Sequence, residues 1–233
     1  YVLGVNTLNE HLSYITIRGA RKRDHPQSFS YHEPWWYAYN IMASYFTRLS
    51  VALSHGQQIN NILLIEPTTT TWMYQPDSSH RNHLNKIGNE FQKMVTQMSK
   101  AQVEYDLGCE DIIARNGSVE DASFKVGKCE YDLVVIPPLT ENLNTKTMNL
   151  LEAYVKNGGI VLCCGSPPNL LDGKPSNRAV LVSQNSSWKQ IDPADVTGIL
   201  RERPRDDFAV YRDDNDRGIL FHQRRRLADG EVL

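Results

Sequence analysis

Apolar residues recur at three- and four-residue steps in three parts of the chain, and this spacing is typical of amphipathic helices. Pro34 suits the first turn of one helix, and Asn144 suits the N-cap of another. Glycines follow the first and third patterns, where they favour helix ends. We therefore expect three long helices, over residues 34–56, 79–101 and 144–158.

Short continuous apolar runs alternate with these helices. "NNILLIEP", "YDLVVIPP" and "GIVLCC" are strand-length and show no polar face, which is typical of strands buried on both sides. "VEYDL" predicts a shorter strand, "CEDIIA" a short helix and residues 117–132 a hairpin. We expect a threonine-rich loop after Pro67 and a short helix over 193–200. The order predicts an α/β fold: a flavodoxin-like (class I glutamine-amidotransferase-like) open parallel sheet with helices on both faces.

The pattern divides the chain into three parts. Residues 1–56 hold a basic loop and a packing helix, residues 57–185 the α/β domain, and residues 186–233 a linker and the start of a β-rich domain. In the last part "DFAVYRD" and "GILFHQRRRL" predict strands. The closing "RRRLADGEVL" predicts a hairpin that stops halfway around an Asp-Gly turn, so we expect a chain cut from a longer polypeptide.

Composition narrows the function. A formal net charge of −2 gives no overall field for nucleic acid or an anionic membrane, and no apolar run is long enough to span a bilayer. The apolar share of 40% is ordinary for a globular protein. The four cysteines, Cys109, Cys129, Cys163 and Cys164, show no zinc spacing and favour core packing. We expect no metal and no cofactor.

Ligands of open parallel sheets bind beyond the carboxyl ends of the strands. The threonine run "PTTTTW" stands where flavodoxins hold a phosphate, but it has no glycine to bend backbone N–H groups around an anion. An amidotransferase needs a nucleophile at a sharp turn, and "VVIPPLTENL" offers none. Both patterns favour a structural α/β domain over a catalytic one.

The densest group of charged and aromatic residues is "RGARKRDHPQSFSYHEPWW", residues 18–36. Interleaved acids weaken a nucleic-acid interpretation, which leaves a solvated charged loop or a polar, aromatic site for a hydroxyl-rich ligand. Glu10, Asp24 and Glu33 are carboxylates here, but the sequence pairs no two of them for catalysis. The residues predicted to contact a sugar are His11, Tyr14, Arg18, Arg21, Lys22, Asp24, His25 and Trp35.

Several stretches together resemble large bacterial multidomain glycoside hydrolases of the α-L-rhamnosidase-like kind. They are "GVNTLNEHLSYITIRGARKRDHP", "EPWWYAYNIMASYFTRLSVALSHGQQINNILLIEPTTTTW", "YDLVVIPP", "YVKNGGIVLCCGSPP" and "FHQRRRLADGEVL". In such enzymes the end of a (β/α)8 barrel runs into a β-galactosidase-trimerisation-like, amidotransferase-like domain, and β-sandwich domains follow. The resemblance covers nearly the whole chain, and it leaves the sugar open.

The resemblance implies that residues 1–56 are a barrel-end segment whose loop faces the sugar, while the catalytic acid and nucleophile lie elsewhere in the enzyme. The chain is then an inactive piece of a glycoside hydrolase, with a scaffolding or oligomerising α/β domain. Its partners are a carbohydrate substrate, the barrel and sandwich domains of its own polypeptide, and copies of itself. The parent enzyme is expected to be periplasmic or secreted. A free-standing flavodoxin-like domain for a small phosphorylated ligand is the alternative, and a structural interaction module is a third hypothesis.

Overall fold

The structure is a computed structural model that describes residues 4–9, 18–20, 31, 33–75, 78–203, 210–211, 213, 215 and 217–232. The chain forms two compact units. One is Tyr1–Ile59 together with Gln223–Leu233, and the other is Asn60–His222. We call the first the helical unit and the second the α/β unit. Among the described residues, no helix is both long enough and apolar enough to cross a bilayer.

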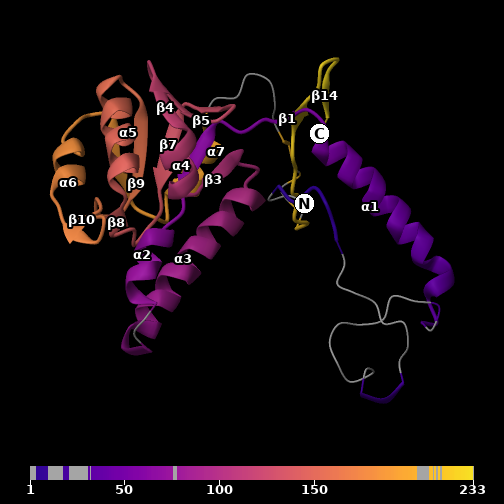
Figure 1. The fold of residues 1–233 in the computed structure, drawn as a ribbon. Helices are drawn as coiled ribbons and strands as arrows, with labels where there is room; N and C mark the ends of the chain where they lie inside the picture. The colour runs from indigo at the N-terminus through magenta and orange to yellow at the C-terminus, as the bar shows by residue number, and fades with distance from the viewer. Residues whose placement is uncertain are drawn as a thin grey trace. The chain divides into compact units, whose positions relative to one another are not determined.

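A five-stranded parallel sheet forms the centre of the α/β unit (Figure 1). Its spatial order is β12-β9-β7-β2-β3, and every neighbouring pair is parallel. In chain order the strands therefore lie 2-1-3-4-5, which is the order of flavodoxin-like sheets. The predicted fold class is confirmed. The strands are β2 (Ile62–Ile65), β3 (Tyr105–Gly108), β7 (Leu133–Ile136), β9 (Ile160–Cys164) and β12 (Trp188–Ile191).

Helices cover both faces of the sheet, which explains why β2 and β7 are buried at every position. On one face, Ile62 and Leu64 pack in a core with Met98 of α3 and Leu200 of α7. On the other face, the alternate side chains of the same strands pack with helices α4, α5 and α6 and with a small antiparallel sheet. The helices are α3 (Arg81–Lys100), α4 (Glu110–Asn116), α5 (Thr145–Lys156), α6 (Arg178–Val182) and α7 (Val196–Arg201).

The small antiparallel sheet includes the predicted hairpin and adds a third strand. Phe124 points from this sheet into the core, where its ring meets that of Tyr154 edge-on at a centroid distance of 5.6 Å. Burial of both rings fastens the hairpin to α5. The strands are β4 (Gly117–Glu120), β5 (Ser123–Val126) and β6 (Cys129–Tyr131).

The predicted loop after Pro67 is wrong, because the threonine run forms the helix α2 (Thr68–Tyr74). Threonine has a modest helix propensity, but tertiary hydrogen bonds compensate for it here. The Thr69 hydroxyl donates to the Glu110 carboxylate, and the Thr70 hydroxyl accepts the Asn142 N–H. Within the helix, the Thr71 N–H donates to the Pro67 carbonyl at 3.0 Å. A short 3-10 turn, η3 (Ser78–His80), comes directly before α3.

Residues 188–201 hold two further elements of the α/β unit. They form β12, which is the fifth strand of the sheet, and α7, which corresponds to the predicted helix over 193–200. The strand shows no continuous apolar run because it lies at the edge of the sheet, with Lys189 and Gln190 exposed and Trp188 buried. The predicted division of the chain at residues 56 and 185 stays a prediction.

A second small sheet lies beyond the carboxyl end of β7 and was not expected from the sequence. Its strands are two residues long, too short to show a period. Asn144 is the N-cap residue of α5 as expected, but its side chain makes no capping bond. Asp172 accepts the Thr145 N–H at 3.0 Å instead. The strands are β8 (Asn142–Leu143), β10 (Leu170–Leu171) and β11 (Lys174–Pro175).

The helical unit holds the first predicted helix and the predicted closing hairpin. The helix begins with a 3-10 turn. The first strand of the hairpin pairs antiparallel with the segment after the helix, and the second strand returns beside the first beyond Asp229 and Gly230. The Arg225 guanidinium donates to the carbonyls of His55 (2.6 Å) and Gly56 (3.0 Å), and so joins the hairpin to the helix end. The elements are η2 (Trp36–Ala38), α1 (Tyr39–Ser54), β1 (Gln57–Gln58), β13 (Arg225–Arg226) and β14 (Glu231–Val232).

Candidate functional site

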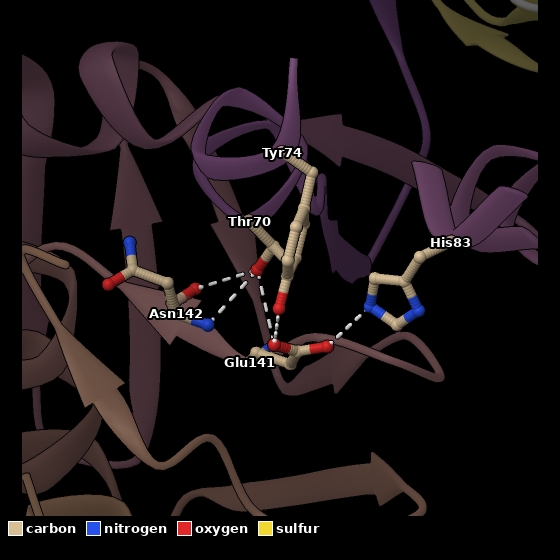
Figure 2. Close-up of polar contacts among 5 residues, drawn as sticks. All are labelled: Thr70, Tyr74, His83, Glu141 and Asn142. Carbon is tan, nitrogen blue, oxygen red and sulfur yellow. Dashed lines mark hydrogen bonds and ion pairs between the residues drawn. The ribbon is translucent and has the colours of Figure 1, made fainter. Parts of the chain in front are cut away.

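The carboxyl edge of the parallel sheet is where this fold offers a site, next to the point where the strand order reverses. That point lies between β2 and β7. Helix α2 follows β2 directly, and β8 follows β7 after a short loop. Five polar residues from α2, α3 and the β8 segment meet there: Thr70, Tyr74, His83, Glu141 and Asn142 (Figure 2). We call them the carboxyl-edge cluster.

Thr70 fastens α2 to the segment that follows β7. Its hydroxyl is fully buried and accepts the backbone N–H groups of Glu141 (3.1 Å) and Asn142 (3.0 Å). It also lies 3.4 Å from the Asn142 carbonyl, to which it donates. A buried hydroxyl with three partners is fully used, so Thr70 has no remaining capacity to bind a ligand.

Glu141 links two helices. One carboxylate oxygen accepts the Tyr74 hydroxyl of α2, and the other lies 2.8 Å from Nε2 of His83 in α3 (Figure 2). The Tyr74 ring also packs edge-on against the His83 ring, with centroids 4.6 Å apart. The hydrogen bond to Glu141, with burial, raises the pKa of Tyr74 from 10.0 to about 12. Tyr74 is therefore a neutral donor at physiological pH and not a nucleophile.

A second carboxylate, that of Glu110 in the first turn of α4, also contacts α2 and is buried, with 2% of the residue's surface exposed. It accepts the Thr69 hydroxyl at 2.6 Å and the Asn144 N–H at 2.7 Å. These two donors, with the helix N-terminus, compensate the cost of burying the charge. Glu110 thus joins α2, α4 and the start of α5.

These contacts determine what the edge can do. The hydroxyls of Thr69, Thr70 and Thr71 all bond to protein groups, and the surrounding carboxylates are those of Glu110 and Glu141. A phosphate placed at the threonine run meets negative charge and engaged hydroxyls. The geometry is that of a brace between helices, and it disfavours a phosphate cradle.

The two adjacent cysteines lie inside β9 and not at a turn. Both are buried, and burial raises the pKa of each thiol from 9.0 to about 12. The thiolate is the nucleophilic form, so neither cysteine is activated at neutral pH. The expectation from sequence that Cys163 and Cys164 pack in the core agrees with this placement.

Most of the residues predicted to contact a sugar lie outside the described residues. Two are described: Arg18 is exposed, in the short stretch 18–20, and Trp35 is 38% exposed just before η2. The Trp35 ring lies 5.9 Å from that of Tyr39, so it packs partly on its own helix. The sugar-contacting role of the whole set stays a prediction. The residues outside the described ranges are His11, Tyr14, Arg21, Lys22, Asp24 and His25.

The carboxyl-edge cluster was not predicted from the sequence. Thr70 and its hydrogen-bonding partner Asn142 are 72 positions apart in the sequence, so no local spacing indicates the cluster. Its one sequence signal is the threonine run itself, at the carboxyl end of a buried strand. Four hydroxyls there indicate a hydrogen-bonding role, with partners that only the sheet order brings close.

The fold is similar to part of a known enzyme. No protein-family model matches the sequence, and no curated protein matches it. A solved structure of a rhamnosidase from Novosphingobium sp. PP1Y is similar over 88% of this chain, with a TM-score of 0.55 and 16% sequence identity. The match takes in 20% of that enzyme's chain, so this chain spans about a fifth of its length. At this identity the likeness shows a shared fold.

Proposed function

We propose that the chain is a non-catalytic part of a larger carbohydrate-active glycoside hydrolase, in which the α/β unit is a scaffold. The observation that carries the proposal is the likeness to the rhamnosidase structure. The similarity covers 88% of the chain, which is more than the α/β unit (Asn60–His222) makes up, so it also includes part of the helical unit. A flavodoxin-like sheet by itself is common to many functions, so the added helical unit makes the likeness more specific.

The carboxyl-edge cluster supports a scaffolding role. The hydroxyls and carboxylates where this fold usually binds a ligand instead join α2, α3, α4 and β8 to one another. Such cross-links stiffen the domain, and a stiff domain holds its neighbours in a fixed position. The same contacts disfavour the alternative, a flavodoxin-like domain for a phosphorylated ligand.

The apolar face of α1 supports a partner for the helical unit. Ile41 is 71% exposed and Tyr45 is 62% exposed, while only Leu53 of this helix is buried. Apolar side chains at helical spacing gain stability when another surface covers them. We propose that the catalytic barrel of the parent enzyme covers this face, and that the predicted loop residues from His11 to Trp35 border its sugar site.

The experiment compares hydrolysis of a panel of aryl glycosides by the full-length protein and by the 233-residue chain alone. We expect the full-length protein to hydrolyse at least one glycoside and the chain to hydrolyse none. Arg21→Ala and His25→Ala in the full-length protein are expected to lower kcat/KM about tenfold or more, the loss of one strong substrate hydrogen bond. Lys156→Ala, an exposed change at the end of α5 and outside the loop, is the control and should leave the kinetics unchanged.

Two results contradict the proposal. Hydrolysis by the 233-residue chain alone contradicts its non-catalytic role. Unchanged kinetics in both loop variants show that the loop does not border the sugar site. Saturable micromolar binding of flavin mononucleotide to the chain favours the phosphorylated-ligand alternative instead.

The partner of α1 has its own test, Ile41→Asp. In the chain alone an exposed substitution changes the free energy of unfolding by about 0.5 kcal/mol or less. In the full-length protein we expect Tm to fall by several degrees, because a charge is then buried against the barrel. Equal Tm values for the full-length wild type and variant show that nothing covers Ile41.

A further inference from the structure

A groove of about 310 Å³ opens beside α3, and none of its lining residues belongs to the carboxyl-edge cluster. Its walls are α3, the segment after β7 and the segment after β12, so it also lies at the carboxyl edge of the sheet. The volume is at the lower end of the ~300–1,000 Å³ range of small-molecule sites. We call it the α3–β12 groove, with Glu90, Lys93, Gln97, Pro138, Asp192 and Pro193 among its lining residues.

The charges of the groove point to a neutral ligand. Two carboxylates, Glu90 and Asp192, and one ammonium, Lys93, line it. Both carboxylates repel a bound anion, which disfavours phosphate. The Lys93 ammonium repels a bound cation and competes with it for the Glu90 carboxylate, which lies 3.9 Å from Lys93 Nζ.

The hydrogen-bonding groups point to a hydroxyl-rich ligand. Glu90 and Asp192 accept hydrogen bonds, while Lys93 and the Gln97 amide donate them. Hydroxyl groups on neighbouring carbons of a sugar ring donate and accept at once, so they match this mixture. Asp192 Oδ1 accepts the Ala194 N–H at 2.8 Å, which fixes the carboxylate on its loop.

Apolar contacts complete the match. Pro138 and Pro193 come from two different segments and place rigid rings in the lining. The C–H face of a sugar ring is apolar and gains from such contacts, while its rim stays polar. The groove thus combines apolar ring surfaces with acceptors and donors.

We propose that the α3–β12 groove is a sugar-binding site that accommodates a single ring. The inference rests on the proposed function only for the expectation that the parent enzyme meets carbohydrate. Because the groove is open and polar, affinity is expected to be weak, with a Kd on the order of 1–10 mM. Binding there would hold substrate near the enzyme without hydrolysing it.

The test is NMR titration of the 233-residue chain with L-rhamnose, D-galactose and D-glucose. Each is used as the free sugar and as its methyl glycoside, which distinguishes a free sugar from a ring at the end of a glycan. We expect saturable shifts of the Gln97 side-chain amide and the Ala194 backbone amide with at least one sugar. Lys93→Met and Gln97→Leu are each expected to weaken binding at least fivefold. Lys86→Met, two turns earlier on α3, is the matched control and should leave Kd unchanged.

Three results overturn the proposal: no saturable shift at 100 mM sugar (~10 times the expected Kd), shifts that map away from the groove, or shifts there only with inorganic phosphate or putrescine. Its failure is separable from that of the proposed function. If the full-length protein hydrolyses a glycoside but no sugar binds in the groove, only the sugar-site proposal is wrong. If sugar binds in the groove but the full-length protein hydrolyses nothing, only the proposed glycoside hydrolase activity is wrong.

Discussion

Helices α1 and α3 have similar apolar spacing in the sequence but very different surroundings in the structure. α3 buries Ile87, and it packs Met94, Val95 and Met98 against the sheet. α1 buries only Leu53 and leaves Met42 and Tyr45 exposed. An apolar stripe is stabilising only where another surface covers it, so the two helices contribute unequally to the chain's stability.

The difference separates two roles. The α/β unit has two apolar cores, one on each face of its sheet, and its carboxyl edge is braced by hydrogen bonds. The helical unit carries an apolar helix face that its own described residues leave exposed. We infer that the α/β unit supplies stability and that the helical unit supplies a contact surface.

Methionine substitutions in α1 and α3 test whether the two helices contribute unequally to stability. They have the largest expected effect on the free energy of unfolding. Met98→Ala removes a side chain with no exposed surface, and should lower the free energy of unfolding by about 2–5 kcal/mol. Met42→Ala, whose side chain is 39% exposed, should cost about 0.5 kcal/mol or less. Urea unfolding followed by circular dichroism measures both. Equal losses show that the face of α1 is covered in the chain alone.

A pair of threonine substitutions tests how α2 is held within the α/β unit. Thr70→Val keeps the shape but leaves the N–H groups of Glu141 and Asn142 without their acceptor, which should cost about 1–3 kcal/mol. Thr96→Val, in which an exposed hydroxyl donates to its own helix, is the matched control. Urea unfolding should show a clear loss for the first and about 0.5 kcal/mol or less for the second. Similar values for both contradict the bracing role of α2.

The smallest expected effect concerns pH. The native pKa of Tyr74, about 12, lies above its ordinary value of 10.0, so the neutral hydroxyl favours the folded state. Its contribution is complete below about pH 10 and is lost as pH rises through about 12. Tyr74→Phe should therefore reduce the fall in unfolding free energy between those pH values. Parallel wild-type and variant curves over this window show that Glu141 does not hold the Tyr74 proton.

The sequence predicted the sheet and its helices because long periodic segments and continuous apolar runs carry strong local signals. It failed where tertiary contacts decide the structure. Thr68–Tyr74 is helical through hydrogen bonds to residues about 70 positions away, as with Thr70 and Asn142. Strand β12 was missed because an edge strand with two exposed polar residues shows no apolar run.

The candidate site was less predictable than the fold. The fold rule directs attention to the carboxyl ends of the strands, which is where the carboxyl-edge cluster lies. The missing glycines weaken a phosphate site, and that expectation stays a prediction. Glu141 and His83 gave no signal, because their pairing depends on how α3 returns past the end of β7. The described residues place Arg18 and Trp35 but do not test the predicted sugar loop.

The most direct test of the central claim measures glycoside hydrolysis by the full-length protein with and without Glu141→Gln. We expect the wild-type protein to hydrolyse an aryl glycoside. We expect the variant to keep kcat within about twofold while Tm falls, because Glu141 braces α2 and α3 and we propose that it lies outside the catalytic centre. A large loss of kcat in a folded variant, or the absence of any glycoside hydrolysis by the wild type, would contradict the proposed scaffolding role in a glycoside hydrolase.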